Sequence, residues 1–264
     1  HVYLINHSIP TVIKHSMYDL IISDIDGCLS PEDSSPMNLE KLGTIAQHNQ
    51  LAFLQGDRPK LTLCTGRPIA FVEALCRVLQ NRDVPCVAEN GVWLFDPRDN
   101  QYSMDPSITP DQLEMVHAAE RLSLEMFQDQ GVTLQPGKSA SVTLYHPDPE
   151  VIHGVIPALK AEFEKRGWQF RVSPTLFYIN CDLPQINKAS GIDQLLVRTN
   201  IDPKRTAGIG DTSSDLAIAD RVETFGCPAN AFAEVKEAAD FVSKFEQIDG
   251  VLDFMHYLES QSDA

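Results

Sequence analysis

Short apolar runs alternate with helix-period stripes in the first ninety residues. The run at 20–22 is typical of a strand that is covered on both faces in a parallel sheet. Similar runs occur at 60–64 and 85–88, and amphipathic helices are predicted over about 38–54 and from Pro68 onward. This order predicts a βαβαβ unit and therefore a doubly wound parallel sheet.

The pattern changes after residue 92. The predicted elements there are a hairpin around a turn at 96–100, a helix over about 110–129, a strand at 139–145, a helix over about 149–166, and strands at 168–172 and 176–181. Strands that follow one another directly indicate antiparallel pairs, unlike the preceding unit.

The βα alternation resumes at Lys188, with a helix over about 188–198 and a strand at 206–209. We therefore expect an α/β protein with a Rossmann-like core formed by 1–92 and 182–264. An α+β cap domain at 93–181 is expected to be inserted into it. Residues 2–5 fit either a short edge strand or an irregular lead-in.

The chain is acidic, with a formal net charge of -16 from 37 Asp and Glu against 21 Lys and Arg. Such a surface argues against binding to nucleic acid or to anionic membranes. An anionic substrate would need local positive charge, from a metal ion or a buried lysine. The six scattered cysteines form no CxxC pair, and no signal peptide or long apolar run is evident, so a cytoplasmic location is expected.

Four polar clusters stand where predicted strands end or helices begin. They are Asp24 with Asp26 and Gly27, Thr65-Gly66-Arg67, Lys188, and Asp211 with Asp215. Each alone has another interpretation: a turn after a strand, a helix N-cap at Thr65, a solvated lysine, or an acid at a helix start. Together on one doubly wound pattern they predict a site at the carboxyl edge of the sheet.

These residue types fit phosphoryl transfer. A carboxylate such as Asp24 can act as nucleophile and form an aspartyl-phosphate. Asp26, two residues later, is placed to protonate the leaving alcohol and then to activate water. Mg²⁺ prefers oxygen ligands, which Asp24, Asp211 and the backbone carbonyl of Asp26 offer. Thr65 and Lys188 can bind the remaining phosphate oxygens.

The four clusters resemble the motifs of haloacid dehalogenase superfamily phosphatases. The matching segments are Asp24-Ile25-Asp26-Gly27-Cys28, Thr65-Gly66-Arg67, Asn187-Lys188 and Gly210-Asp211-Thr212-Ser213-Ser214-Asp215. Glu89-Asn90-Gly91 and the tail from Cys227 to Val251 resemble the Cof-type branch, whose cap lies between the second and third motifs.

The resemblance implies a role for each matched residue. Its implied nucleophile is Asp24 and its general acid/base is Asp26. Its implied phosphate-binding residues are Thr65, Gly66 and Lys188, and its implied magnesium ligands are Asp24, Asp26, Asp211 and Asp215. Two positions depart from the family pattern, because Cys28 replaces a usual threonine and Ser214 a usual asparagine. Neither change removes a carboxylate.

Substrate contacts are expected from the cap and from the rim of the core. The segment 137–146 loosely resembles the lysine-serine-histidine cap segment of phosphatases for sucrose, trehalose and mannosylglycerate phosphates. Candidate substrate-binding residues are Arg67, Asn90, Lys138, Ser141, His146 and Asn187, with Arg171 and Tyr178 as weaker ones. Ser141, Thr143 and Tyr145 also fit the exposed face of an ordinary alternating strand.

The predicted protein is a Mg²⁺-dependent phosphatase that acts on a small phosphomonoester, most simply a sugar or sugar-acid phosphate. A phosphotransferase or phosphomutase on the same scaffold is an alternative, with a second alcohol in place of water. A phospho-aspartate receiver module is another, but receivers lack the second acid at Asp26 and an inserted cap. The oligomeric state is left open.

Overall fold

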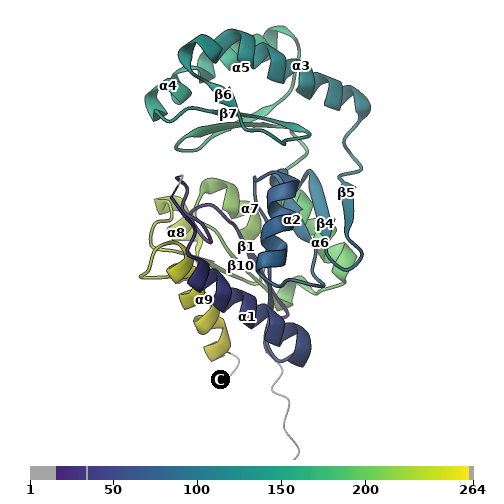
Figure 1. The fold of residues 1–264 in the computed structure, drawn as a ribbon, viewed down its shortest axis with the longest axis vertical. Helices are drawn as coiled ribbons and strands as arrows, with labels where there is room; N and C mark the ends of the chain where they lie inside the picture. The colour runs from purple at the N-terminus through teal and green to yellow at the C-terminus, as the bar shows by residue number, and fades with distance from the viewer. Residues whose placement is uncertain (1–15, 34, 262–264) are drawn as a thin grey trace, which may run out of the picture.

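The computed structural model describes residues 16–33 and 35–261. The segment 2–5, considered above as an edge strand, lies outside the described residues. A layered core forms the lower half of the molecule in Figure 1, and a second layer of helices over a sheet lies above it. Within the described residues, no helix combines the length and the apolar character that a membrane span requires.

The core sheet has five parallel strands in the order β12-β11-β10-β1-β2. They are β1 (Leu20–Ser23), β2 (Lys60–Leu63), β10 (Thr206–Ile209), β11 (Thr224–Cys227) and β12 (Phe241–Val242). Residues of β1 pair with β10 on one side and with β2 on the other, and β1 is completely buried. The predicted doubly wound α/β fold is confirmed.

Helices cover both faces of this sheet. One face carries α1 (Leu39–Gln55), α2 (Ile69–Val78) and α9 (Gln247–Gln261), and the other carries α6 (Lys188–Thr199), α7 (Leu216–Ala219) and α8 (Ala233–Ala238). The side-chain alternation of β1 explains the division, because Ile21 packs in the first apolar cluster while Leu20 and Ile22 pack in the second. All six cysteines are free and buried.

A hairpin extends the core at its β2 edge. It is formed by β4 (Trp93–Asp96) and β5 (Gln101–Met104), and β4 pairs antiparallel with β3 (Cys86–Ala88). Asp96 at the end of β4 accepts a 2.7 Å hydrogen bond from Nε of Arg198 in α6. The hairpin therefore packs with the core, although the predicted boundary at 92/93 assigned it to the cap. We propose 105–182 as the extent of the cap.

The cap is a four-stranded antiparallel sheet, ordered β6-β7-β9-β8, under a layer of helices (Figure 1). Its elements are α3 (Pro110–Phe127), β6 (Thr133–Leu134), β7 (Ser141–Tyr145), α4 (Pro149–Gly154), α5 (Ile156–Lys165), β8 (Arg171–Pro174) and β9 (Tyr178–Asp182). The single helix predicted over 149–166 is wrong, because it divides at Val155. Pro157 has no N–H to continue the hydrogen-bond ladder.

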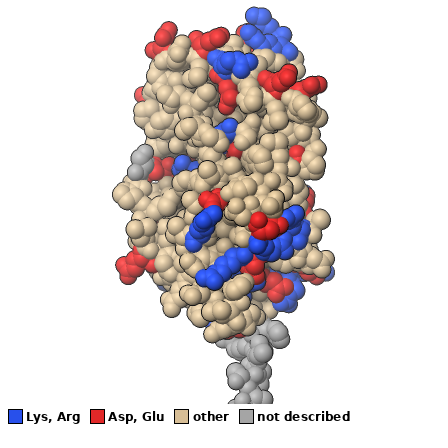
Figure 2. Space-filling model, turned by 45° about the vertical axis from the view of Figure 1, so that its right-hand side comes forward, with Lys and Arg blue, Asp and Glu red and all other residues tan. Residues whose placement is uncertain are grey.

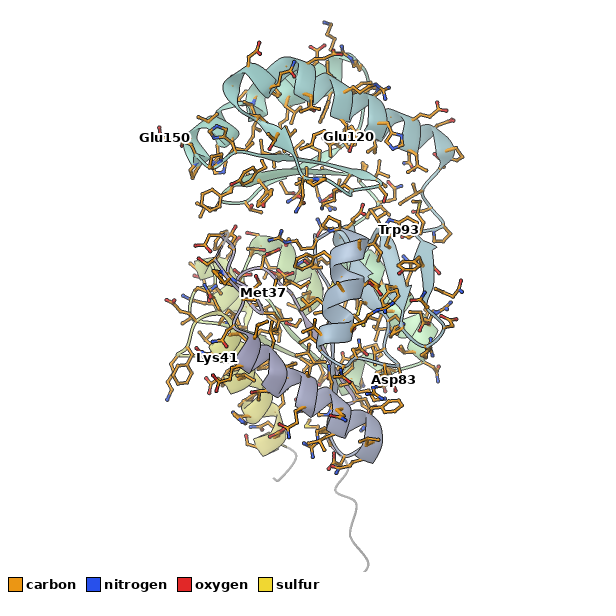
Figure 3. The ribbon with its side chains drawn as sticks, in the orientation of Figure 1. Met37, Lys41, Asp83, Trp93, Glu120 and Glu150 are labelled. Carbon is orange, nitrogen blue, oxygen red and sulfur yellow. The ribbon has the colours of Figure 1, made fainter. Side chains whose placement is uncertain are left out.

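Cap and core meet through Trp93 and the loop before β7. Figure 3 places Trp93 at this junction, with side chains of the two halves pointing toward one another across the space beside it. The Trp93 indole donates a 3.0 Å hydrogen bond to Ser139 Oγ. The buried carboxylate of Glu89 accepts bonds from the Ser139 and Ala140 backbone N–H groups at 2.8 and 3.4 Å. These bonds fix the start of β7 to the core.

Charged side chains of both signs are mixed on the surface. Figure 2 shows Lys and Arg interspersed with Asp and Glu over the lower half of one face. Among the core's ion pairs, Asp96 binds both Arg98 and Arg198 at 2.7 Å. Both arginines are therefore paired with a carboxylate. The chain as a whole has a formal net charge of -16, so acids are in excess over cations.

Candidate active site

The structure brings the four polar clusters together at the carboxyl edge of the core sheet. Asp24 directly follows β1, Thr65 lies two residues beyond β2, and Asp211 lies two residues beyond β10. Lys188 is the first residue of α6, whose N-terminus reaches the same edge. Parallel strands all end at this edge, so side chains far apart in sequence converge there.

Lys188 lies buried between two carboxylates. Its Nζ is 2.5 Å from Asp215 Oδ1 and 2.9 Å from Asp24 Oδ1. Exposed fractions are 3% for Lys188, 6% for Asp24 and 0% for Asp215. Burial opposes the charge of Lys188, but the coulombic attraction of Asp215 and Asp24 raises its pKa well above the ordinary value. The site therefore contains a permanent positive charge.

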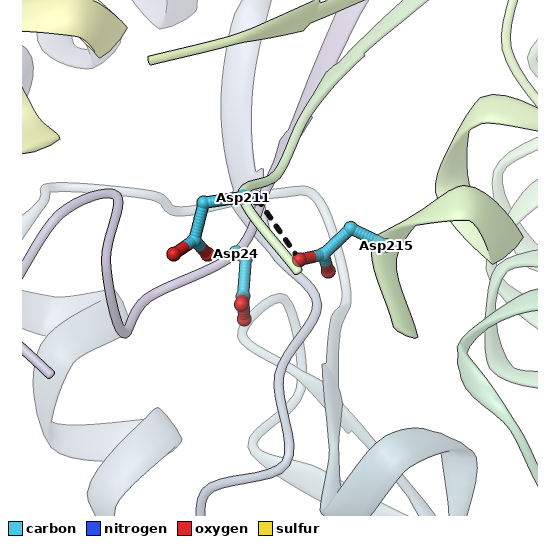
Figure 4. Close-up of side chains that lie close together, drawn as sticks. All are labelled: Asp24, Asp211 and Asp215. Carbon is cyan, nitrogen blue, oxygen red and sulfur yellow. Dashed lines mark hydrogen bonds between the residues drawn. The ribbon is translucent and has the colours of Figure 1, made fainter. Parts of the chain in front are cut away.

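Asp24, Asp211 and Asp215 form a compact carboxylate cluster (Figure 4). Each offers an oxygen within 4.8 Å of the others. Burial, followed by repulsion from Asp215, raises the pKa of Asp24 to about 7 and that of Asp211 to about 9. One lysine therefore does not balance three buried acids.

Two oxygens of this cluster lack hydrogen-bond donors within the described part of the chain. Asp24 Oδ1 and Asp211 Oδ1 are buried and accept no hydrogen bond from the described residues. Asp24 Oδ1 is within ion-pair distance of Lys188. Buried carboxylate oxygens without donors, in a cluster with excess negative charge, are the ligand set that a hard divalent cation prefers. The residues present therefore fit a Mg²⁺ ion.

Asp215 differs from the other two acids because its oxygens are already engaged. Its Oδ2 accepts the backbone N–H groups of Asp211 at 3.0 Å and Thr212 at 2.9 Å, and its Oδ1 accepts from Lys188. The dashed line in Figure 4 marks the bond to Asp211. Asp215 thus holds the loop that carries Asp211 and orients Lys188.

Asp26 faces Arg67 rather than the carboxylate cluster. The guanidinium donates from Nε to Oδ2 at 2.7 Å and from Nη2 to Oδ1 at 2.5 Å. Such bidentate pairs define the orientation of both groups. Arg67 is braced in turn by Phe71, whose ring centroid lies 5.2 Å from the guanidinium carbon. The side chain of Asp26 is therefore a poor candidate for a metal ligand, which leaves the predicted backbone carbonyl.

Gly27 allows the loop after β1 to approach Asp211. Its φ is +76°, and a Cβ at this position would lie 1.9 Å from Asp211 Oδ2. Asn230 supports the same contact, donating to the Gly27 carbonyl at 2.9 Å and to Asp211 Oδ2 at 3.4 Å. No side chain fits between the loop and Asp211.

The Gly27→Ala substitution is therefore expected to displace Asp211 and to lower kcat/KM for p-nitrophenyl phosphate at least about 100-fold. Phosphate release over a range of Mg²⁺ concentrations measures the effect. Gly43→Ala is the matched control, because a methyl group added to Gly43 in α1 would meet none of the described atoms within 4 Å. Activity of Gly27→Ala equal to that of the wild type would show that the loop tolerates a side chain.

A cavity of about 610 Å³ lies between this edge and the cap. From the core it is lined by Asp24, Asp26, Glu32, Thr65, Gly66, Arg67, Asn90, Asn187, Lys188, Thr212, Ser213, Ser214, Ala217 and Phe232. From the cap it is lined by Gln135, Arg171, Val172, Ser173, Pro174, Thr175, Tyr178, Asn180 and Asp182. Ligand pockets for small molecules commonly measure about 300–1,000 Å³.

Two predicted cap residues do not line this cavity. Ser141 is fully buried, and its hydroxyl has no hydrogen-bond partner among the described residues. The imidazole of His146 lies near Gly131 and its Nδ1 accepts the N–H of Asp148 at 3.0 Å. The structure therefore gives no support for these two residues as substrate contacts.

The other predicted contacts lie closer to the cavity. Lys138 reaches from the cap to donate a hydrogen bond to the Gly66 carbonyl, and burial lowers its pKa. Asn90, at φ +55°, lines the cavity and donates to Asp182 at 3.1 Å. Asn187 also lines it, but its side-chain oxygen caps α6 by accepting the Ser190 N–H at 2.9 Å.

Several residues that line the cavity were not predicted from the sequence, chiefly Asp182, Asn180, Gln135 and Glu32. The alternation of Tyr178, Asn180 and Asp182 in β9 was the available signal, because residues at i, i+2 and i+4 share a face. Of the two departures from the family pattern, Cys28 is fully buried and Ser214 lines the cavity with its Oγ 3.0 Å from Thr212 Oγ1.

Comparison with known proteins agrees with this geometry. A family model described as haloacid dehalogenase-like hydrolase matches residues 21–137 and 118–255. The chain belongs to the haloacid dehalogenase-like hydrolases. The family model confirms the predicted superfamily and its Cof-type branch, and the names of the relatives support a phosphatase.

Two curated relatives of this haloacid dehalogenase-like hydrolase extend over nearly its whole length. The phosphoglycolate phosphatase of Methanopyrus kandleri is 27% identical and covers 94% of this chain and 100% of its own. YxeH of Bacillus subtilis, named as a candidate phosphatase, is 25% identical, and the match covers 92% of this chain and 98% of YxeH. A solved structure from Thermoplasma acidophilum has a TM-score of 0.72 at 22% identity. The match covers 92% of this chain and 99% of that one.

Proposed function

We propose that this hydrolase is a Mg²⁺-dependent phosphatase that cleaves a small phosphomonoester through an aspartyl-phosphate on Asp24. The observation that carries the proposal is that Asp24 and Lys188 line a cavity under the cap, with the buried carboxylate of Asp211 beside Asp24. The proposed substrate class is a sugar or sugar-acid phosphate. Phosphoglycolate, which the names of several relatives specify, is the competing substrate to test.

In the first step, an oxygen of Asp24 attacks phosphorus and the bond to the leaving alcohol breaks. Lys188 neutralises phosphate charge from one side, while the hydroxyl of Thr65 and the Gly66 backbone are proposed to bind other oxygens. Asp26 delivers a proton to the leaving oxygen. Because both oxygens of Asp26 are held by Arg67, we infer that this pair loosens as substrate enters.

In the second step, water attacks the phosphorus of the aspartyl-phosphate and Asp26 accepts its proton. Phosphate then leaves and the carboxylate of Asp24 is restored. Mg²⁺, when bound, supplies positive charge that neutralises and orients the transferring phosphoryl group. We propose Asp24, Asp211 and the Asp26 carbonyl as its ligands, with Asp215 supporting them. The cap excludes bulk water from the cavity during both steps.

Removal of the metal is expected to abolish phosphate release. The assay uses a panel of sugar phosphates, phosphoglycolate and p-nitrophenyl phosphate, with Mg²⁺ or with EDTA. We expect a loss of at least about 100-fold in EDTA, restored by excess Mg²⁺, because one lysine cannot balance three carboxylates and a phosphate. Full turnover in EDTA contradicts the metal assignment. Accumulation of phosphorylated enzyme that yields product only when an alcohol is added would indicate a phosphotransferase.

A further inference from the structure

The underside of the cap sheet forms a polar roof over the cavity. Along β9, Ile179 and Cys181 point into the apolar cluster beneath the cap helices. The alternate residues Tyr178, Asn180 and Asp182 line the cavity instead. The roof therefore offers a phenol ring, an amide and a carboxylate to the leaving group of the substrate.

Each cation that lines the cavity within the described residues already has a carboxylate partner. Lys188 lies between two acids, and Arg67 is held by Asp26. Arg171 in β8 donates from Nη2 to Asp182 Oδ2 at 3.2 Å and to the Ile186 carbonyl at 2.7 Å. The positive charge of Arg171 in the roof is therefore balanced by the carboxylate of Asp182.

Asp182 is the counter-charge built into this roof. Its side chain is 3% exposed, and its Oδ2 also accepts from Asn90 at 3.1 Å. The other acid on the cavity wall away from the cluster, Glu32, forms no ion pair within the described part of the chain. Lys138, on the neighbouring loop, donates to the Gly66 carbonyl and does not line the cavity.

The charges can be added group by group. A divalent ion with Lys188 balances Asp24, Asp211 and Asp215, and the two arginine pairs are each neutral. Lys138, whose charge also acts on Asp182, is balanced by the buried Glu89. Glu32 then leaves the space for the leaving group with a net negative charge. A carboxylate placed there would meet like charge, and every described cation lining the cavity is already paired with an acid, whereas hydroxyl groups would meet hydrogen-bond acceptors and an aromatic face.

We propose that the Asp182–Arg171 pair makes the cavity select an uncharged, hydroxyl-rich leaving group and reject one that carries a carboxylate. The inference rests on the proposed phosphatase function and narrows its substrate class to polyol phosphates. Asp182 is the specificity-determining residue, because it engages Arg171 Nη2 and neutralises the guanidinium that would otherwise attract a substrate carboxylate. The cavity volume of about 610 Å³ also suits a leaving group larger than glycolate.

The wild-type enzyme gives the first test, with pairs of esters that share a carbon skeleton and differ in one terminal group. These are glucitol 6-phosphate against 6-phosphogluconate, glycerol 3-phosphate against 3-phosphoglycerate, and 2-hydroxyethyl phosphate against phosphoglycolate. We expect kcat/KM to be at least about tenfold higher for the alcohol of the preferred pair. Equal or faster turnover of the acid overturns the inference, without need of any variant.

The second test changes the charge of the roof. Asp182→Asn frees Arg171, so the ratio of kcat/KM for alcohol over acid is expected to fall at least about tenfold. The double variant Asp182→Asn with Arg171→Gln is expected to lose the increase in kcat/KM for the acid that Asp182→Asn alone produces. Because each ratio is measured within one enzyme preparation, partial misfolding cancels. His146→Asn, on the cap but outside the cavity, is the matched control and should keep the wild-type ratio.

The outcomes separate the inference from the proposed function. An unchanged ratio in Asp182→Asn, or a gain for the acid that survives Arg171→Gln, overturns the role of the pair. Absence of Mg²⁺-dependent phosphate release by the wild type from every ester, p-nitrophenyl phosphate included, overturns the proposed function and the inference with it. Turnover of p-nitrophenyl phosphate with acid preferred over alcohol overturns the inference alone.

Discussion

Turnover by the Asp24→Asn variant is expected to fall at least about 10⁴-fold in kcat, whatever the substrate. The amide keeps the size and shape of the side chain, but it is a far weaker nucleophile than the carboxylate. It also removes one of the two charges beside Lys188 Nζ, which lies 2.9 Å from Asp24 Oδ1. Phosphate release and labelling of the enzyme by substrate phosphate measure both steps, and both should disappear together.

A matched surface substitution separates this effect from a general change in charge. Asp193→Asn removes a carboxylate that pairs with Arg221 at 2.7 Å, and the Asp193 side chain is 53% exposed. We expect its kcat to stay within about twofold of the wild-type value. Retention by Asp24→Asn of more than about a hundredth of wild-type turnover would show that another group attacks phosphorus.

Lys188→Met is expected to lose both activity and stability. Without the ammonium, Asp24 and Asp215 become buried carboxylates with no counter-charge, since they are 6% and 0% exposed. Breaking such a buried pair costs about 3–5 kcal/mol of the free energy of unfolding. The loss of a phosphate-binding charge is expected to lower kcat about 10³-fold. Denaturant unfolding and phosphate release measure the two effects separately.

The metal provides an internal check on Lys188→Met. Bound Mg²⁺ stabilises the folded state that binds it, so added Mg²⁺ should recover part of the lost stability. Lys41→Met is the control, because Lys41 pairs with Asp249 on the partly exposed surface and such pairs contribute about 0–1 kcal/mol. A Lys188→Met variant as stable as Lys41→Met, with or without Mg²⁺, would contradict the charge balance described for the cluster.

The parts of the site nearest the core strands were predictable from the sequence. The apolar run at 20–22 and the acids that follow it are adjacent in the sequence. A continuous apolar run of this kind is typical of a fully buried strand in a parallel sheet. The helices and strands that flank Thr65, Lys188 and Asp211 also follow from local periodicity. Because parallel strands end at one edge, the sequence order alone predicted that these side chains meet.

The pairing of Asp26 with Arg67 was not predictable in the same way. Arg67 followed Thr65 in a motif, but 41 residues separate it from Asp26 and nothing local indicates where a long side chain points. The hairpin at 93–104 is a similar case. Its pattern predicted two strands, yet whether they pair with core or cap depends on contacts with β3 and Arg198.

The cap shows the same limit most clearly. Alternation indicated that Tyr178, Asn180 and Asp182 share one face, but both faces of a cap sheet are covered, one by helices and one by the core. Ser141 pairs in register with Asp182, which lines the cavity, and yet Ser141 is fully buried and does not line it. Which polar residues contact a substrate depends on this docking and not on the strand pattern.

By itself, the sequence determined the fold class, the family motifs and the identities of the converging carboxylates and lysine. These follow from short-range patterns, because burial and turn formation act on neighbouring residues. Only the tertiary structure decided which ion pairs form, Arg67 with Asp26 and Arg171 with Asp182. It also decided that His146 lies outside the cavity. Ion pairing and burial of this kind depend on distances between segments remote in sequence, which exist only once the chain has folded.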